Sequence, residues 1–520
     1  MADYFLPGEM ENEITRPEII QNMPHYRQKG RRFTENMAGW CMTAKPGIPS
    51  TWMNSMPDVQ RLDKAQLVML IEEKLVPRKD GLACLKAIKD LEKDGVEGVK
   101  KARAAAGAGI FSGENYLTDL LGEHVGGIIH LGRSTGDETT GTLRMAMRAE
   151  ILNILDKAIL YRERLIEVAE KHVETPWVTY TGFQAAQIST LAHYLLDFLY
   201  KADHACKKLK LDYGEVNRSP MGAAIGTGSN FPVNRERVAE LLGYDSVITN
   251  THEAISTEDK VFMIEVFGTL VLLLAPVEKL ASYMFFFSCT ECGFVQAADR
   301  FCDSSSIMPQ KRNPFLLYNT ASKVHGVYSA FFEDILEETA LICWPRGAMI
   351  KRAFQDAKDA LDNGGLSMAT MKINKEKILY NLSYNWCCAT DLAGALVREH
   401  AISWREAHQI VSLISRWAEE RDIPSRDLNN KLIEEASMEH LGRKLRLKAS
   451  TIKDVLDPMV SIRTRTLTGG PAPENSLKSI AEMKAGIAQD KVFVADARKR
   501  LAAADVKLDK AVAKLLTAKS

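Results

Sequence analysis

The chain has 520 residues, of which 46% are hydrophobic, so it can bury one large core or several smaller ones. Lysine plus arginine and aspartate plus glutamate both number 67, which gives a formal net charge of zero. No global field therefore favours nucleic acid or an anionic membrane, and any anion site must be local.

The cysteines and the N-terminus indicate a cytoplasmic protein. Nine cysteines show no spacing typical of a disulfide framework, and the acidic start MADYFLPGEMENE has no basic and apolar leader. Cys289 and Cys292 form a lone C-x-x-C pair without a histidine cluster nearby, so no metal site is predicted. The longest uncharged apolar run, residues 266–277, is too short to cross a bilayer.

The N-terminal part divides into an arm and a helical domain. Residues 1–60 are rich in proline and are predicted to form an extended arm. Residues 61–127 are predicted to form a small helical domain. Its apolar residues recur at helical spacing, as at Leu67, Leu70 and Ile71.

Residues 128–375 are predicted to form a central bundle of long helices. Residues 142–175 contain neither glycine nor proline, so they predict a helix roughly 50 Å long. Apolar residues follow one face of it from Leu143 to Val168. Further helices are predicted at residues 189–212, 257–275, 277–292 and 315–341. Five such rods without a run of alternating strands indicate an all-α fold.

The remainder is predicted to be helical as well. A less regular stretch follows Pro345, and a C-terminal helical domain is predicted for residues 376–475, with helices near 404–421 and 425–440. A glycine- and proline-rich turn closes that domain. Residues 476–520 are rich in alanine and lysine, which favours a solvated helical tail.

The densest chemistry lies in a serine loop, residues 304–314, which reads SSSIMPQKRNP. Pro309 and Pro314 prevent either neighbouring helix from continuing through it. A serine here can act as a base or a nucleophile if Lys311 and backbone N–H groups stabilise the developing charge. An ordinary polar interhelical loop with a helix cap explains the composition at least as well.

The serine loop and three other stretches resemble the argininosuccinate lyase family of the fumarase/aspartase superfamily. The serine loop is similar to that family's pattern G-S-S-x-M-P-x-K-x-N-P, with Ser304 in place of the glycine. Two polar segments are also similar: the first, IIHLGRSTGDE (residues 128–138), to H-T-G-R-S-R-N-D-Q, and the second, TYTGFQAAQISTLAHYLL (residues 179–196), to G-Y-T-H-L-Q-x-A-Q-P. With residues 217–244 and 461–474, the resemblance spans about residues 60 to 480 in the family's order.

This resemblance implies an all-α protomer of three domains that assembles into a homotetramer, with each active site built from three protomers. It implies an anti β-elimination of an amine from an N-substituted aspartate, reversibly giving fumarate. The substrate is then a small amino-acid-derived carboxylate. No cofactor, nucleic acid or membrane partner is implied.

The resemblance also assigns residues. Ser305 is implied as the catalytic base, with Lys311 and Asn313 stabilising the carboxylate or the alkoxide. The substrate contacts that it implies are Ser306, Gln355, Lys358, Thr181, Gln184, Gln187, Arg133, Ser134, Thr135 and Asp137.

Several of the family's ligand positions are changed. Thr135 and Gly136 stand where the family has Arg-Asn, and Gly182 stands for a histidine. Asp63 aligns with a serine and Ile350 with a tyrosine. Losing one bidentate Arg–carboxylate contact costs on the order of 2–3 kcal/mol, so argininosuccinate is predicted to be a poor substrate.

The histidines do not replace the lost contacts. His130 precedes Arg133 and is predicted to be a hydrogen-bonded structural residue. His193 is predicted to serve packing.

Three hypotheses follow. The first is a C–N lyase acting on another N-substituted aspartate or amino acid, as ethylenediamine-disuccinate lyases do. The second is a true argininosuccinate lyase with altered substrate contacts. The third is a non-catalytic structural protein like the delta-crystallins, against which the intact Ser305 and Lys311 argue. A fumarate-release screen separates the three.

Overall fold

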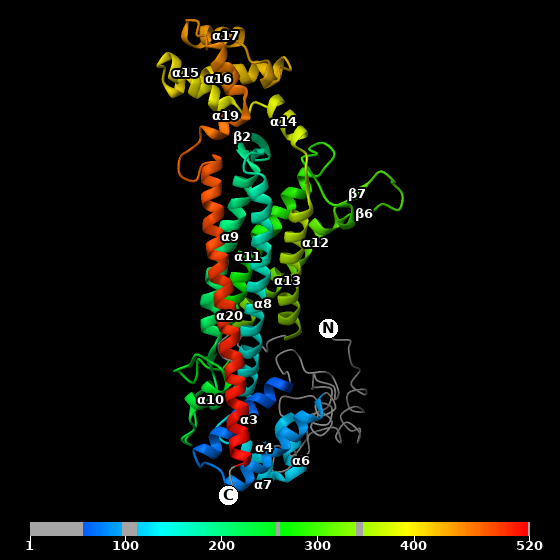
Figure 1. The fold of residues 1–520 in the computed structure, drawn as a ribbon, viewed down its shortest axis with the longest axis vertical. Coiled ribbons are helices and arrows are strands. Elements are labelled where there is room, and N and C mark those ends of the chain that lie inside the picture. The colour runs from blue at the N-terminus through cyan, green and yellow to red at the C-terminus, as the bar shows by residue number, and fades with distance from the viewer. Residues whose placement is uncertain (1–55, 96–111, 256–260, 340–346, 518–520) are drawn as a thin grey trace, which may run out of the picture.

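The computed structural model describes the chain at residues 56–95, 112–255, 261–339 and 347–517. These residues form an elongated, almost wholly helical molecule, with a small helical domain at each end of a long central bundle (Figure 1). The predicted all-α fold is confirmed. Most of the predicted N-terminal arm, residues 1–55, lies outside the described residues.

The N-terminal helices share one apolar core. Leu67, Leu70 and Leu85 are fully buried in it, as the helical spacing predicts. The elements at this end are α3 (Met56–Glu72), α4 (Arg78–Lys93), α6 (Ser112–Leu121), α7 (Glu123–Gly126) and the 3-10 helix η4 (Gly127–His130).

The longest helices of the central bundle are α8 (Thr135–Lys171), α9 (Leu191–Val216), α11 (Val261–Phe287), α12 (Phe315–Thr339) and α13 (Gly347–Thr370). The predicted seam of α8 is buried from Leu143 to Val168. The helix begins seven residues earlier than predicted, because the Ser134 side chain caps its first turn. It ends before Pro176, where a strand begins.

Two predicted boundaries in the bundle are wrong. Pro276 lies inside α11, where a helix break was predicted. Proline removes one backbone hydrogen bond, but the packing of α11 against α9, α12 and α13 maintains the helix. The stretch after Pro345, predicted to be irregular, forms α13. Its Gly364 permits close packing, since a Cβ there would lie 2.8 Å from Val277 Cγ1.

Helix α11 is long and apolar enough, by length and composition, to cross a membrane. Half of its most apolar window is buried against other helices of the bundle. It lies within the bundle as a core helix (Figure 1).

The last 45 residues of the described chain form one helix, α20 (Pro473–Thr517), about 68 Å long. The helix prediction is confirmed, but the segment is not a solvated tail. It runs back along α8 and α9 and reaches α10 (Arg235–Leu242), α3 and α4 (Figure 1). Val494, Leu508 and Val512 are buried on its inner face, and Asp490 forms an ion pair with Arg162 of α8.

The C-terminal domain packs at the other end of the bundle and is helical, as predicted. Its elements are α14 (Lys375–Tyr384), α15 (Ala389–His400), α16 (Trp404–Glu420), η7 (Ser425–Asp427), α17 (Asn430–Leu441), α18 (Ala449–Leu456) and α19 (Pro458–Arg463).

Short strand pairs join the helices. The described residues contain β1 (Pro176–Thr181) with β2 (Gln184–Thr190), β3 (Arg218–Ser219) with β4 (Ser246–Val247), β5 (Val295–Gln296) with β8 (Lys372–Ile373), and β6 (Asp303–Ser304) with β7 (Arg312–Asn313). Two 3-10 turns, η5 (Ala224–Gly226) and η6 (Asp299–Phe301), complete the connections. Of these four pairs, β3–β4 is parallel and the other three are antiparallel.

Candidate active site

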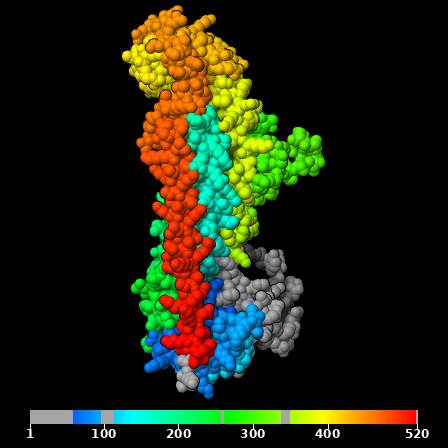
Figure 2. Space-filling model, viewed as in Figure 1, coloured from blue at the N-terminus to red at the C-terminus, as the bar shows by residue number. Residues whose placement is uncertain are grey.

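The serine loop forms a hairpin that projects sideways from the bundle (Figure 1, Figure 2). Strands β6 and β7 pair at its base, Asp303 with Asn313 and Ser304 with Arg312. At its tip the Lys311 N–H donates to the Met308 carbonyl at 3.1 Å, which closes a turn around Pro309. Ile307 is 84% exposed, so the described residues leave its side chain at the tip uncovered.

Within this hairpin the Ser305 hydroxyl is held by the backbone. Its Oγ accepts hydrogen bonds from the N–H groups of Ile307 at 3.3 Å and Met308 at 3.0 Å. Two donors aimed at one oxygen favour its deprotonated form, as donors in an oxyanion hole do. The loop geometry therefore suits a serine that acts as a base.

Lys311 and Asn313 lie on the same hairpin and line a hollow of about 550 Å³ at its base, together with Gln296, Gln310 and Cys302. Within the described part of the chain, the Lys311 ammonium is exposed and has no ion-pair or hydrogen-bond partner. The Lys311 cation and the Asn313 amide can both stabilise a bound carboxylate.

The departure at Ser304 does not distort the loop. Ser304 pairs in β6 and is not among the residues with a positive φ, so glycine's conformational freedom is not needed there. Ser306 is exposed beside Ser305.

Gln355 and Lys358 lie on α13, and both have partners within the protomer. The Lys358 ammonium is 2.8 Å from Glu150 Oε2 on α8. The Gln355 amide donates to Asp359 Oδ1 at 2.7 Å and remains exposed. Ile350, predicted to line a substrate pocket, is instead buried in the bundle core.

The second polar segment forms the β1–β2 hairpin. Thr181 pairs with Gln184, which leaves a two-residue turn of Gly182 and Phe183. Both have a positive φ, +56° and +59°, as a type I′ turn requires. The positive φ at position 182 therefore explains why a glycine stands there. Thr181, Gln184 and Gln187 are exposed on this hairpin.

His130 and His193, the two histidines for which structural roles are predicted, both have hydrogen-bond partners. His193 Nδ1 is 2.9 Å from Ser189 Oγ, and its Nε2 is 3.0 Å from the Gly469 carbonyl. His130 Nδ1 is 3.0 Å from Glu114 Oε2. The contact of His130 agrees with its predicted hydrogen-bonded structural role, whereas the packing role of His193 stays a prediction.

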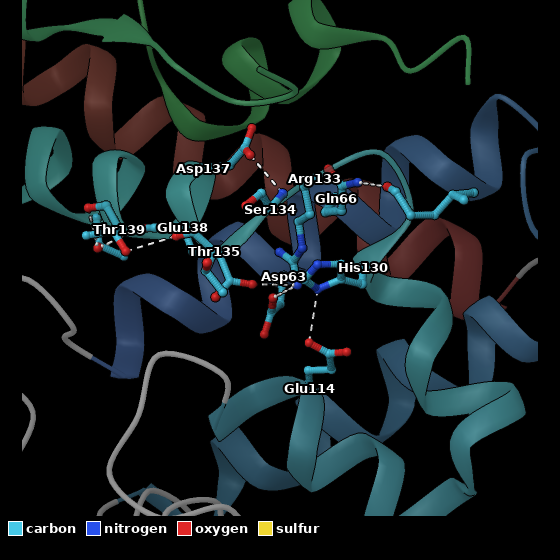
Figure 3. Close-up of polar contacts among 12 residues, drawn as sticks. Asp63, Gln66, Glu114, His130, Arg133, Ser134, Thr135, Asp137, Glu138 and Thr139 are labelled. Atoms are coloured by element: carbon cyan, nitrogen blue, oxygen red, sulfur yellow. Dashed lines mark hydrogen bonds and ion pairs between the residues drawn. The ribbon is translucent and has the colours of Figure 1, made fainter. Parts of the chain in front are cut away.

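The first polar segment forms the start of α8 (Figure 3). Ser134 is the N-cap: its Oγ accepts from the Gly136 N–H, and its own N–H donates to Asp137 Oδ2 at 2.8 Å. Thr135 is half-buried in the first turn. Burial raises the pKa of Asp137, while N–H donors from Ser134 and Ala224 act in the opposite direction.

Arg133 points inward from this segment. Its Nη2 donates to Asp63 Oδ1 at 2.6 Å and lies 3.0 Å from Glu138 Oε1 (Figure 3). Asp63, which aligns with a serine among the family's ligand positions, is the internal partner of Arg133. Arg133 thus has a structural role within the protomer.

This charge cluster was not foreseen from the sequence. Burial raises the pKa of Glu138 to about 8 and also raises that of Asp63, although the Arg133 cation opposes both shifts. A signal was available in the position of Asp63, because the apolar residues Leu62 and Ala65 close to it in the sequence are buried on the same helix. Which cation it meets depends on packing between α3 and α8.

The two polar segments are not brought together within one chain. The first lies at the start of α8 and the second follows its end, so most of this helix of 37 residues, about 55 Å long, separates them. In Figure 1 they lie at opposite ends of the bundle.

Sequence comparisons give a family context for this arrangement. The chain matches the lyase family profile over residues 79–327 and the argininosuccinate lyase C-terminal profile over residues 386–463. It is 32% identical over 429 residues to the argininosuccinate lyase of Methanocaldococcus jannaschii, covering 80% of this chain and 86% of that one. It is 28% identical to that of Methanosphaera stadtmanae, covering 82% and 92%.

Among solved structures, the fold is similar to an EDDS lyase in complex with formate. The TM-score is 0.83 at 26% identity, over 90% of this chain and 93% of that one. A class II fumarase from Schistosoma mansoni has a TM-score of 0.62 at 13% identity, covering 79% and 91%, which shows a shared fold alone.

Proposed function

The chain belongs to the argininosuccinate lyase family of the fumarase/aspartase superfamily, and from this premise we propose the roles of its residues and the class of its substrate. It is a carbon–nitrogen lyase that eliminates an amine from an N-substituted aspartate-type substrate and gives fumarate. We assign the elimination to the serine loop.

The observation that carries this assignment is the Ser305 hydroxyl, whose Oγ accepts two backbone N–H bonds. As an alkoxide it removes a proton from the carbon next to a carboxylate. Lys311 and Asn313 stabilise the charge that the carboxylate then takes up. The electron pair of the broken C–H bond forms the carbon–carbon double bond of fumarate as the C–N bond breaks. The nitrogen, which is already protonated in the substrate, takes the C–N electron pair and leaves as a neutral amine.

We propose that the site is completed in a homotetramer. The two polar segments lie about 55 Å apart along α8, so a site that uses both needs more than one copy of the chain. Large apolar side chains are exposed on the bundle helices that flank the serine loop: Phe285 and Phe286 on α11, and Phe315 and Phe332 on α12. Such a surface favours association with further copies.

Hybrid sites test this assembly. Ser305→Ala and Thr181→Ala proteins, each inactive alone, are expected to regain partial activity when they are unfolded together and refolded as mixed oligomers. A protein that sediments as a monomer at micromolar concentration would contradict the shared site.

We propose a substrate other than argininosuccinate, handled by a cytoplasmic enzyme. The family pattern has an arginine at the position of Thr135, and neither Thr135 nor Gly136 carries a positive charge. Arg133 forms ion pairs with Asp63 and Glu138. The substrate is then anchored mainly by Lys311, Asn313, Gln355 and Lys358. A bulkier or less charged amine fits this arrangement best.

A fumarate-release screen over N-substituted aspartates tests the proposal. For argininosuccinate we expect a kcat/KM at least 10³-fold below the usual range of about 10⁴–10⁸ M⁻¹s⁻¹, and a higher value for another member of the set. Efficient cleavage of argininosuccinate would show that other residues bind its carboxylates. Absence of fumarate release from every compound would overturn the lyase assignment of the serine loop.

A further inference from the structure

The start of α8 adjoins a buried cluster in which, among the described residues, carboxyl groups outnumber cations (Figure 3). The side chains of Asp63, Arg133 and Glu138 are 2%, 0% and 2% exposed. Glu114 of α6 and His130 of η4 adjoin them and contact each other at 3.0 Å. Two fully buried carboxyl groups therefore share one guanidinium.

The hydrogen bonds show that this sharing is incomplete. Both carboxyl groups contact the same Arg133 nitrogen, Nη2. Among the described residues, Arg133 Nε and Nη1 and Glu138 Oε2 have no hydrogen-bond partner. A second buried negative charge is costly when two nitrogens of the neighbouring guanidinium make no hydrogen bond to it. Protonation of one carboxyl group removes that charge.

The geometry also indicates which carboxyl group takes the proton. Asp63 has the shorter contact with Arg133, 2.6 Å against 3.0 Å for Glu138. Glu138 has an oxygen, Oε2, that accepts no bond and can carry a hydrogen. The raised pKa of Glu138, about 8, agrees with this distribution.

We propose that Glu138 is a positioning residue that carries a proton at neutral pH, so that Arg133 pairs with Asp63 and fixes the first turn of α8. Ser134 caps that turn and Thr135 begins it, and both are substrate contacts that the family resemblance implies. The link to substrate rests on the proposed function. The proton on Glu138 does not.

Every charged group facing Glu138 bears on its protonation. Arg133 favours ionisation, whereas Asp63 of α3, Glu114 of α6 and Asp137 of α8 all oppose it. His130 faces Asp63 and Glu114 rather than Glu138. Losing the proton would add a charge to a site that already contains three carboxyl groups, and would loosen the turn that Arg133 holds.

The linkage has a definite sign. The pKa of Glu138 is higher in the folded chain than the ordinary value of 4.5, so the folded state keeps a proton that the unfolded state releases. Stability is therefore greatest below the unfolded pKa and declines as the pH rises from about 5 to about 8. Glutamine at 138 has the shape of the protonated acid and removes this dependence.

A second buried cluster provides a matched control. Arg162 pairs with Asp203 and Asp490, which also contact Lys207 at 2.7 Å and Lys210 at 2.5 Å. Three cations meet two carboxylates there, so no proton is needed. Asp203→Asn is expected to lower the melting temperature at every pH without changing its pH slope.

The experiment compares full-length native, Glu138→Gln and Asp203→Asn proteins between pH 5 and 9, by thermal melting and by fumarate-binding calorimetry. We expect the native melting temperature to fall from about pH 5 to pH 8 and the Glu138→Gln curve to lack this component. For native protein, fumarate is expected to bind roughly 5-fold more weakly at pH 9 than at pH 7, and for Glu138→Gln to change by less than about 2-fold.

The outcomes separate the two proposals. Equal pH slopes for native and Glu138→Gln proteins would overturn the proton on Glu138, whatever fumarate does. If no variant binds fumarate at any pH, the proposed function fails while the melting curves still decide on Glu138. If Glu138→Gln does not fold, Asp63→Asn replaces it, since removing the Asp63 charge lets Glu138 ionise against Arg133 and flattens the same slope. An unchanged slope in Asp63→Asn overturns the proposal.

Discussion

The serine loop and the first polar segment both resemble the same family, yet they differ physically. In the serine loop, Lys311 is exposed and has no side-chain partner among the described residues. In the first polar segment, Arg133 is buried and bound to Asp63 and Glu138. The loop presents its polar groups outward, where a substrate and neighbouring copies can meet them. The segment uses its polar groups to build the fold.

The sharpest test of this contrast is Ser305→Ala, for which we expect the largest effect on rate. The elimination should slow by about 10²–10⁴-fold, because the base is lost. The melting temperature should change little, since a half-buried hydroxyl on a projecting hairpin contributes little packing and holds only local turn hydrogen bonds. Ser383→Ala, which removes an exposed hydroxyl from α14, is the control and should keep full activity. More than about a tenth of the rate in Ser305→Ala would place the base elsewhere.

Arg133→Met tests the other side of the comparison. Removing the guanidinium leaves Asp63 and Glu138 buried without a cation, so we expect a loss of about 3–5 kcal/mol in the free energy of unfolding. Arg312→Met is the control: this arginine of the serine loop is exposed and pairs with Asp299, and its loss should cost less than about 0.5 kcal/mol. Denaturant unfolding measures both. Unchanged stability with lost fumarate binding would instead make Arg133 a substrate contact.

The same contrast explains what the sequence could predict. The serine loop was recognised as a loop because Pro309 and Pro314 act locally. The pairing of Arg133 with Asp63 joins residues 70 positions apart, and only packing between α3 and α8 determines it. Helix continuity at Pro276 has the same origin, because contacts with other helices outweigh a local preference.

The position of α20 shows a further limit. Its alanine and lysine content predicted a helix correctly, since helix propensity is a local property. Its burial against α8 depends on partners such as Arg162 for Asp490, more than 300 residues away. Composition alone therefore favoured a solvated tail.

A smaller effect is expected at the exposed surface of α12. Phe332 is 63% exposed on α12, and Phe332→Asp is expected to weaken self-association by at least about 2 kcal/mol, as at an interface hot spot. Leu477→Asp, at an exposed apolar position on α20, is the control and should leave the assembly intact. Sedimentation velocity across a concentration series measures both. Equal association of native and Phe332→Asp proteins would move the interface away from this surface.

The smallest effect concerns specificity, where the first polar segment can be made to present a cation. Thr135→Arg restores the residue type of the resembled pattern in the first turn of α8. We expect it to raise kcat/KM for argininosuccinate by only about 10-fold, because a cation at a helix N-terminus opposes the helix dipole. Thr139→Arg, one turn further along the same helix, is the matched control and should bring no gain.

Adding Gly182→His should raise kcat/KM for argininosuccinate by less than Thr135→Arg does. A Cβ at 182 would meet no atom within 4 Å, so there is space for a side chain. The positive φ of +56° strains any residue with a Cβ, by roughly 1–2 kcal/mol, and so opposes the turn that presents the new imidazole.

The gain from Thr135→Arg should appear mainly in KM, since a carboxylate contact far from the breaking bond binds ground and transition states alike. A gain confined to kcat would mean that residue 135 lies next to the reacting carbon, and the first polar segment would then belong to the catalytic centre itself.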